Sequence, residues 1–441
     1  MKELLEFLSF SNPNVRVVTF GTMFIGMSAA MVGSFAFLRK RSLIGDAIAH
    51  AILPGIAISF MVTQSKNPYI LMFGALISGW AAMLLIEAIT KHSKLKPDTA
   101  IGLVLSVFFG VGILLLTHIQ HSGAGNQAGL DQFLFGKAAS MTKDDLIAYS
   151  VVASILLVTV FLLFKEFKLM SFNAEFAQIS GLPVKSLQFV LSSITVLAIA
   201  TGIQAVGVVL MAALIITPAA AARSWTENLV KMLFIAGFAG MLSGFVGSYI
   251  SFTAPNMPTG PWIVMSLSAI AVISLVFAPK RGLWSKMKRQ RENREKILTE
   301  NILKAIYHLS ERRDADFPVI DEEDLQEIRQ FNSDELKKGL RLLKKRFLIL
   351  RQAEGFRLSE AGLTEAKRVV RLHRLWEMYL TQRMRLKADH IHPNAETIEH
   401  IISPEIEEEL LRELGYPDKD PHESPIPYEG SSPPKSPYRG T

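Results

Sequence analysis

The 441-residue sequence predicts an all-α membrane protein of eight or nine transmembrane helices, followed by a soluble winged-helix and helical dimerisation domain. Two observations carry this prediction. Long apolar runs recur through residues 1–278, and the charges are unevenly divided. Residues 1–278 hold 16 Lys/Arg and 11 Asp/Glu, whereas residues 279–441 hold 31 and 29. Because a soluble domain is about 25% charged, one large soluble enzyme is excluded, and so is a protein lying wholly in the membrane. The absence of cysteine also excludes disulfides, thiolate zinc sites and cysteine nucleophiles.

Nine apolar runs approach the length of about 20 residues that a bilayer-spanning helix needs. They lie near 15–38, 46–63, 68–89, 100–119, 146–164, 187–203, 205–222, 229–252 and 261–278. Residues 187–222 also allow a different break, so the count is eight or nine. Basic residues concentrate in alternate loops, at 39–41, 91–96, 165–185, 223–231 and 280–281. The positive-inside rule places these loops and the C-terminal domain in the cytoplasm, as in a multi-pass protein of the inner (cytoplasmic) membrane.

Ionisable residues are rare in the apolar runs and are therefore candidates for function. Asp46 and His50 stand four residues apart, so a helix places the carboxylate and the imidazole on one face. Such a pair suits a divalent transition metal in transit. The alternative is an Asp at a helix start and a histidine that hydrogen-bonds to a neighbouring helix.

Several stretches around this pair resemble the permeases of ABC importers for manganese, zinc and iron. They are 37–51 (FLRKRSLIGDAIAHA), 95–102 (LKPDTAIG), 135–136 with 144–146, 206–214 (VGVVLMAAL) with 217–219, and 257–261 (MPTGP). The resemblance covers residues 10–280. It implies a permease that pairs with a second permease subunit, receives metal from an extracytoplasmic metal-binding protein and is driven by a separate ATPase. It also implies that Asp46 and His50 contact the metal in the pathway.

The loop at 172–183 (FNAEFAQISGLP) is predicted to be a short amphipathic helix that ends at a glycine. By pattern alone, an ordinary interfacial helix is an equal alternative. The segment resembles the coupling loop of ABC permeases, which implies that Glu175, Ala177 and Gly181 contact the ATPase. No Gly-x4-Gly-Lys-Ser/Thr motif occurs in the chain, so we expect a transport subunit rather than an enzyme, with ATP bound by the partner.

After a basic juxtamembrane linker at 279–296, apolar spacing and turn residues predict a winged helix over 297–358. We expect helices from Ile297, over 321–328 and from Ser333 to Lys345, then a hairpin of 347–350 and 356–358 around Gly355. The third helix is the DNA-reading helix of such a fold. Its candidate phosphate contacts are Lys337, Lys338, Arg341, Lys344 and Lys345. A solvated charged face, or a domain that contacts only protein, is the alternative.

The segment 359–420 is predicted to form metal-binding and dimerisation helices, with a disordered tail at 421–441. Its ligand-type residues lie at helix-face spacings and suit Mn, Fe or Zn: His373, Glu377, His392, Glu396, Glu399 and His400. Four stretches resemble metal-dependent repressors of the diphtheria toxin repressor and manganese regulator type: 371–377 (RLHRLWE), 392–400 (HPNAETIEH), 403–407 and 421–427. That family takes further ligands from its first helix, where this chain has Asn301 and Lys304, so the resemblance implies an incomplete site.

The leading interpretation is therefore the permease subunit of a divalent-metal ABC importer with a fused metal-sensing and DNA-binding-like regulatory domain. The alternative is a metal-dependent transcriptional repressor that is held at the membrane or released by cleavage near 279–296. A channel or secondary transporter is disfavoured by the coupling-loop resemblance.

Overall fold

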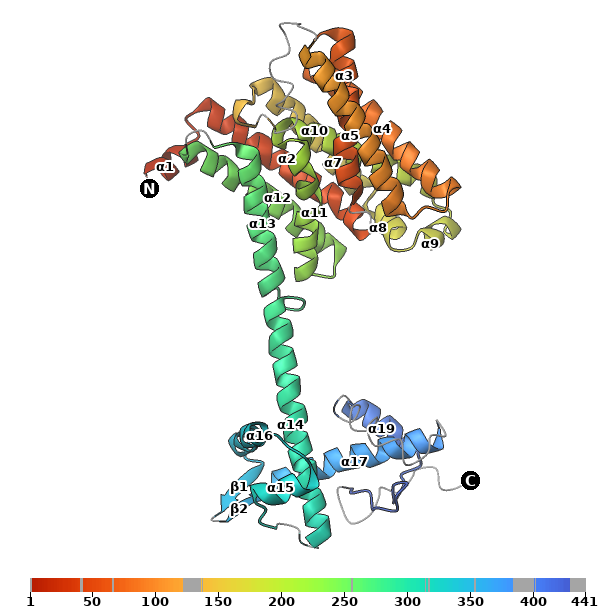
Figure 1. Ribbon diagram of the computed structural model, residues 1–441, viewed down its shortest axis with the longest axis vertical. Coiled ribbons are helices and arrows are strands. Elements are labelled where there is room, and N and C mark those ends of the chain that lie inside the picture. Colours follow the sequence, from red (N-terminus) through yellow and green to blue (C-terminus); the bar gives the residue numbers. More distant parts are fainter. Residues whose placement is uncertain are drawn as a thin grey trace. The chain divides into compact units, whose positions relative to one another are not determined.

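The computed structural model describes residues 2–39, 43–65, 67–121, 136, 138–254, 257–313, 315, 318–352, 354–383, 400 and 402–428. The chain divides into two compact units, Met1–Lys286 and Met287–Thr441. The first unit is helical throughout its described part, and the second combines helices with a two-stranded hairpin (Figure 1). The all-α membrane architecture and the soluble helical domain predicted from the sequence are both confirmed.

The helices of the first unit follow the apolar runs of the sequence. They are α1 (Lys2–Leu8), α2 (Pro13–Leu38), α3 (Leu43–Thr63), α4 (Pro68–His92), α5 (Pro97–His121), the 3-10 turn η1 (Ala138–Ser140), α7 (Lys143–Leu162), α8 (Phe164–Phe172), α9 (Ala174–Ile179), α10 (Val184–Val206), α11 (Val208–Trp225), α12 (Leu229–Thr253) and α13 (Thr259–Phe277). Within the described residues, eight helices are long and apolar enough to cross a membrane, and α11 carries a shorter apolar stretch. The sequence predicted eight or nine transmembrane helices, and the two numbers differ by whether α11 is counted as a separate span.

A glycine resolves the ambiguous region at 187–222. Gly207 ends α10 and precedes α11, with φ +94° and ψ 160°. Only glycine adopts this conformation without strain. A second glycine, Gly136 (φ +82°), lies directly against this break, and a Cβ there would lie 2.4 Å from the carbonyl oxygen of Ala205. The break therefore separates two helices where the sequence alone allowed one.

Helix starts in this unit use side-chain caps. Asn12 and Asn67 accept hydrogen bonds from the second residue after them and precede a proline at the first helical position. Thr142 and Asp145 form a reciprocal capping box at the start of α7. These caps satisfy amide groups that the first turn leaves without helical acceptors.

Small residues let several helices touch backbone to backbone. A Cβ added to Gly26 of α2 would lie 2.4 Å from the carbonyl oxygen of Gly240 in α12, and one added to Gly240 would lie 2.2 Å from that of Gly26. Gly55 of α3 and Gly74 of α4 approach each other in the same way. Lipid is as apolar as a leucine side chain, so close backbone approach is the main source of packing energy between spans. These contacts hold α2 against α12 and α3 against α4.

The second unit has a winged-helix core followed by further helices. Its elements are α14 (Leu283–Arg313, whose first four residues belong to the first unit), α15 (Glu322–Ile328), α16 (Ser333–Lys345), β1 (Ile349–Gln352), β2 (Gly355–Leu358), α17 (Glu360–Gln382) and α19 (Pro404–Glu413). The strands are antiparallel, with Ile349 opposite Leu358 and Gln352 opposite Gly355. Leucines and isoleucines of α14, α15, α16 and the hairpin form one buried core. The predicted order of three helices and a hairpin is confirmed.

Two boundaries differ from those predicted. The first helix of the domain begins at Leu283 rather than Ile297, because the basic run at 283–296 is helical although it has no apolar stripe. The predicted disordered tail is wrong for residues 421–428, where Ile426 is buried and Lys419 forms a β-bridge with Pro425. Residues 429–441 lie outside the described part.

The contact between Gly26 and Gly240 generates a prediction on stability. Gly26→Ala should destabilise the protein by about 1–3 kcal/mol, because the new methyl group overlaps backbone that cannot move aside. Thermal unfolding of the purified chain in detergent, followed by intrinsic fluorescence, measures this change. The control is Gly110→Ala in α5, where an added Cβ meets nothing within 4 Å. Equal melting temperatures for the two variants would contradict the packing argument.

Candidate functional site

Asp46 and His50 lie on one face of α3, as their spacing predicts. Oδ1 of Asp46 is 3.5 Å from Nε2 of His50, and the side chains are 38% and 17% exposed. Asp46 stands in the first turn of the helix, where the exposed amide groups favour a negative charge. A carboxylate and an imidazole therefore face the same small volume.

The surroundings of His50 hold its ring in place. The edge of the ring packs against Phe109 of α5, with centroids 4.7 Å apart and planes at 76°. Its Nδ1 is buried and has no hydrogen-bond partner among the described residues. Four residues on, Pro54 lies inside the continuous helix α3 and has no N–H, so the carbonyl of His50 lacks its usual helical donor. The alternative prediction, a histidine hydrogen-bonded to a neighbouring helix, finds no support in the described contacts.

Asp46 and His50 form a two-residue group of metal-ligand type. No group of three or more His, Asp or Glu side chains able to hold a metal occurs in the part of the chain that the structure describes. Two protein ligands leave the remaining coordination positions to water or to residues outside that part. A conducting site must bind an ion strongly enough to admit it and weakly enough to release it.

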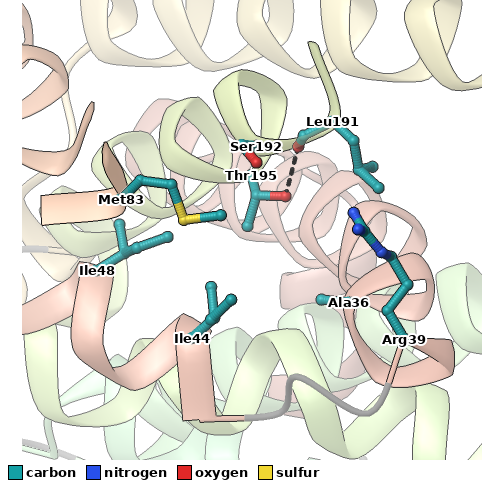
Figure 2. A pocket seen from close by; sticks show the side chains of 8 residues that line it. All are labelled: Ala36, Arg39, Ile44, Ile48, Met83, Leu191, Ser192 and Thr195. Carbon is teal, nitrogen blue, oxygen red and sulfur yellow. Dashed lines mark hydrogen bonds between the residues drawn. The ribbon is translucent and has the colours of Figure 1, made fainter. Parts of the chain in front are cut away.

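A pocket beside α3 is separate from this pair. It is lined by Ala36, Arg39, Ile44, Ile48, Met83, Leu191, Ser192 and Thr195 (Figure 2). Ile44 is two residues from Asp46, and Ile48 is two residues from both Asp46 and His50. Two residues are about 200° around a helix, so the pocket lies on the other side of α3. Its lining has the cation Arg39 and no carboxylate or imidazole, so it is no candidate for a metal cation.

The predicted coupling segment, residues 172–183, forms one short helix, α9, which directly follows α8. Asn173 caps α9, and Gly181 ends it with φ +84° while its own surroundings are open. Ala177 is fully buried, and Glu175 is exposed in the first turn. Ile179 is 84% exposed. The segment is therefore anchored on one side and presents apolar surface on the other.

The predicted DNA-reading helix α16 has a basic exposed face. Lys337, Arg341, Lys344 and Lys345 are exposed. Lys338 pairs with Glu295 of α14 at 3.0 Å. A hydrogen bond from Lys338, and to a smaller extent one from Arg291, holds the pKa of Glu295 below its usual range. All five predicted phosphate contacts are thus exposed, and Lys338 also pairs within the fold.

The predicted ligands of the C-terminal domain have protein partners. Nζ of Lys304 lies 3.1 Å from Nδ1 of His373, and Nε2 of His373 lies 3.1 Å from Oε1 of Glu377. Nδ1 of His400 lies 2.5 Å from a carboxylate oxygen of Glu300 on α14. His392, Glu396 and Glu399 lie outside the described residues, so the six-ligand set stays a prediction.

Two family comparisons bear on these sites. The sequence model of the ABC 3 transport family matches residues 11–278. The chain belongs to the ABC 3 transport family. A second model, the metal-binding and dimerisation domain of iron-dependent repressors, matches residues 359–428. Both resemblances identified in the sequence are confirmed, and with them a multi-pass membrane protein that carries a repressor-type domain.

Individual relatives agree with the family. The manganese transport system membrane protein MntC of Bacillus subtilis is 40% identical over 380 residues, 86% of this chain and 87% of that protein. The zinc transport system membrane protein TroC of Treponema pallidum is 40% identical over 282 residues, 64% of this chain and 95% of that protein. Among solved structures, a chain of PsaBC from Streptococcus pneumoniae, in complex with a Fab, superposes with a TM-score of 0.58 at 31% identity. The superposed region covers 65% of the present chain and 99% of the PsaBC chain.

This ABC 3 family chain also has a buried ionic network that the sequence did not predict. Arg374 of α17 binds Glu311 of α14 in a bidentate pair, lies 3.4 Å from Asp420 and donates to the carbonyl of Pro425. Arg371 pairs with Glu407 of α19 at 2.6 Å and donates to the carbonyl of Pro427. Burial alone would raise the pKa of Glu311, but hydrogen bonds from His308 and Arg374 lower it to about 2.

The network ties residues 425 and 427 to α17, within the range that the repressor-type model matches. Main-chain carbonyls of 425 and 427 supply acceptors to arginines that are less than 10% exposed. Such carbonyls have no residue-specific signal in a sequence. In the sequence, the only indication of this network was the position of Arg371 and Arg374 on an otherwise apolar face of α17.

Proposed function

We propose that this chain is the membrane-spanning permease subunit of an ABC importer that carries a divalent transition-metal ion into the cell. The observation that supports this most directly is the carboxylate–imidazole pair of Asp46 and His50 on one face of a span, in a family whose relatives are named manganese and zinc transport proteins. An ionisable pair inside a span is costly and is retained where it serves transport.

The ligand chemistry limits the cargo to a class. Imidazole and carboxylate without thiolate suit Mn(II), Fe(II) and Zn(II), and the affinity order among these metals does not select one of them. We propose that Asp46 and His50 replace part of the hydration shell as the ion passes α3. A metal-binding protein outside the cell supplies the ion, and a second permease subunit completes the pathway.

A separate ATPase drives transport through the α8–α9 segment. Ala177 anchors α9 to the permease, while Phe176 (55% exposed) and Ile179 (84% exposed) offer an apolar surface to the ATPase. Gly181 turns the chain with a positive φ that other residues rarely adopt. Basic residues flank this segment and follow the last span, which supports a cytoplasmic position for both the segment and the C-terminal domain.

For the fused domain we propose a regulatory role, with DNA as a candidate partner. The support is the repressor-type match together with the exposed basic residues of α16. Basic side chains on a helix can neutralise phosphates whatever the base sequence. The competing function is that of a repressor held at the membrane or released from it by cleavage.

Removal of the carboxylate tests the pathway. Asp46→Ala should lower uptake of radioactive Mn²⁺ or Zn²⁺ by about 10–100-fold, at least the loss that follows removal of a residue supporting a metal ligand. The assay uses the complex reconstituted in proteoliposomes with ATP. Glu227→Gln, which removes an exposed carboxylate outside the spans, is the matched control and should transport normally. Unchanged uptake by Asp46→Ala would remove this pair from the pathway.

Substitution of the exposed apolar residue tests coupling. Ile179→Ser should weaken capture of the partner ATPase and lower metal-stimulated ATP hydrolysis, because it removes the most exposed apolar side chain of α9. Leu283→Ser, at a residue that is 58% exposed outside the α8–α9 segment, controls for the general loss of apolar surface. Equal ATPase capture by both variants would place the coupling contact elsewhere.

Charge reversal on α16 tests the DNA partner. The full chain in nanodiscs of neutral lipid should bind DNA from upstream of its own gene, with an affinity that falls as salt rises. Lys344→Glu with Lys345→Glu should weaken binding and lower the salt slope by about one for each phosphate that is no longer neutralised. Lys419→Glu, an exposed change away from α16, is the control.

Absence of binding by the unchanged protein would leave a domain that contacts only protein. Immunoblotting of the host for a free C-terminal fragment separates a released repressor from a tethered domain.

A further inference from the structure

We propose that the ammonium group of Lys304 serves as a built-in cation in the C-terminal domain, so that the contact between α14 and α17 forms without a metal ion at His373. This inference concerns the fused domain alone and does not depend on the transport proposal. It departs from the repressor-type resemblance, which implies a metal at this place.

The first step is the contact between the two helices. Lys304 lies on α14 and is 7% exposed, and His373 lies on α17 and is 6% exposed. Nζ of Lys304 is 3.1 Å from Nδ1 of His373. An ammonium group can only donate hydrogen bonds, so Nδ1 must be the acceptor. The lysine therefore fixes which nitrogen of the ring carries the lone pair.

The second step follows from the other ring nitrogen. With its lone pair on Nδ1, the neutral ring carries its proton on Nε2, and Nε2 lies 3.1 Å from a carboxylate oxygen of Glu377. A metal ion binds imidazole through a lone pair. The lone pair of His373 points at Lys304, and the opposite nitrogen, which carries the proton, lies beside the Glu377 carboxylate without forming a hydrogen bond to its nearest oxygen. A metal at His373 would therefore have to displace the lysine.

The third step is the charge balance. Glu377 is 1% exposed, and a buried carboxylate is unstable unless positive charge or hydrogen bonds compensate it. A metal ion would supply two positive charges there, and Lys304 supplies one through the intervening imidazole. A divalent ion and a buried ammonium at the same imidazole would repel each other. The described residues around His373 therefore do not fit a metal.

The neighbouring position on α14 agrees with this interpretation. Asn301 accepts a hydrogen bond from Arg329 at 3.1 Å, so it serves the contact of α14 with the loop after α15. The residue before it, Glu300, pairs with His400 and lies 3.7 Å from Lys296. The ammonium of Lys296 also donates to the carbonyl of His400. Two lysines of α14 thus contact both histidines of the predicted ligand set that the structure describes.

The consequence is a domain whose helices assemble whether or not cytoplasmic metal is abundant. A single substitution should reverse this property. Lys304→Glu removes the ammonium and adds a carboxylate oxygen, which together with His373 and Glu377 completes an oxygen- and nitrogen-rich set suited to Mn(II).

The experiment measures hydrogen exchange of α14 and α17 peptides in the full chain in detergent, with added Mn²⁺ or with a chelator. The Asp46→Ala background removes the carboxylate of the proposed transport pair. Without Lys304→Glu, exchange at α17 should be the same under both conditions. With Lys304→Glu, α17 should exchange faster in chelator and be protected by Mn²⁺, and adding His373→Gln should abolish the protection. Lys288→Glu, on an exposed part of the same helix, should acquire no response to Mn²⁺.

Two results would overturn the proposal. One is Mn²⁺-dependent protection of α17 in the chain with Lys304 intact that His373→Gln removes, and this comparison holds even if Lys304→Glu fails to fold. The other is a folded Lys304→Glu chain that gains no Mn²⁺ binding, because Lys304 would then not be what excludes the metal.

Discussion

The cost of placing charge in a medium of low dielectric constant governs both units of this protein. In the membrane unit it leaves apolar helices whose backbone groups are satisfied internally and whose contacts depend on glycine. An ionisable pair such as Asp46 and His50 is conspicuous against that background. In the soluble unit the same cost is met by pairing: Arg371, Arg374 and Lys304 are buried, and each lies against a carboxylate, a carbonyl or an imidazole.

The two units place ligand-type side chains in different surroundings. In α3, a carboxylate and an imidazole share a face, and no cation of the described residues is recorded between them. In α17, His373 and Glu377 have the same spacing, but Lys304 from α14 lies against the imidazole. The same i, i+4 spacing therefore occurs in two different chemical environments. In α17 the difference comes from Lys304, which belongs to another helix. Motif spacing alone does not distinguish the two cases.

Features with local causes were predictable from the sequence. Apolar runs of span length, the i, i+4 pair in α3 and the order of the winged helix all depend on short-range periodicity. The start of α14 was missed because residues 283–296 are charged on all sides, and the break between α10 and α11 depends on one glycine whose φ the sequence does not state. The ordered structure of residues 421–428 was not predicted, because it depends on main-chain carbonyls that accept hydrogen bonds from Arg371 and Arg374. The role of Lys304 could not be predicted from the sequence, because it depends on contact with His373, which is 69 positions away in the chain.

The backbone contact between Gly26 and Gly240 also constrains the gene. Every single-base change at the first or second position of a glycine codon (GGN) introduces a side chain or a stop. Each helix would then meet the carbonyl of the other at less than 2.5 Å. These two codons can vary only at their silent third base unless both helices move apart together. A compensating substitution in the other helix would have to arise about 640 bases away, at three bases per codon. We therefore expect this contact to tolerate fewer amino-acid changes than the lipid-facing surface does.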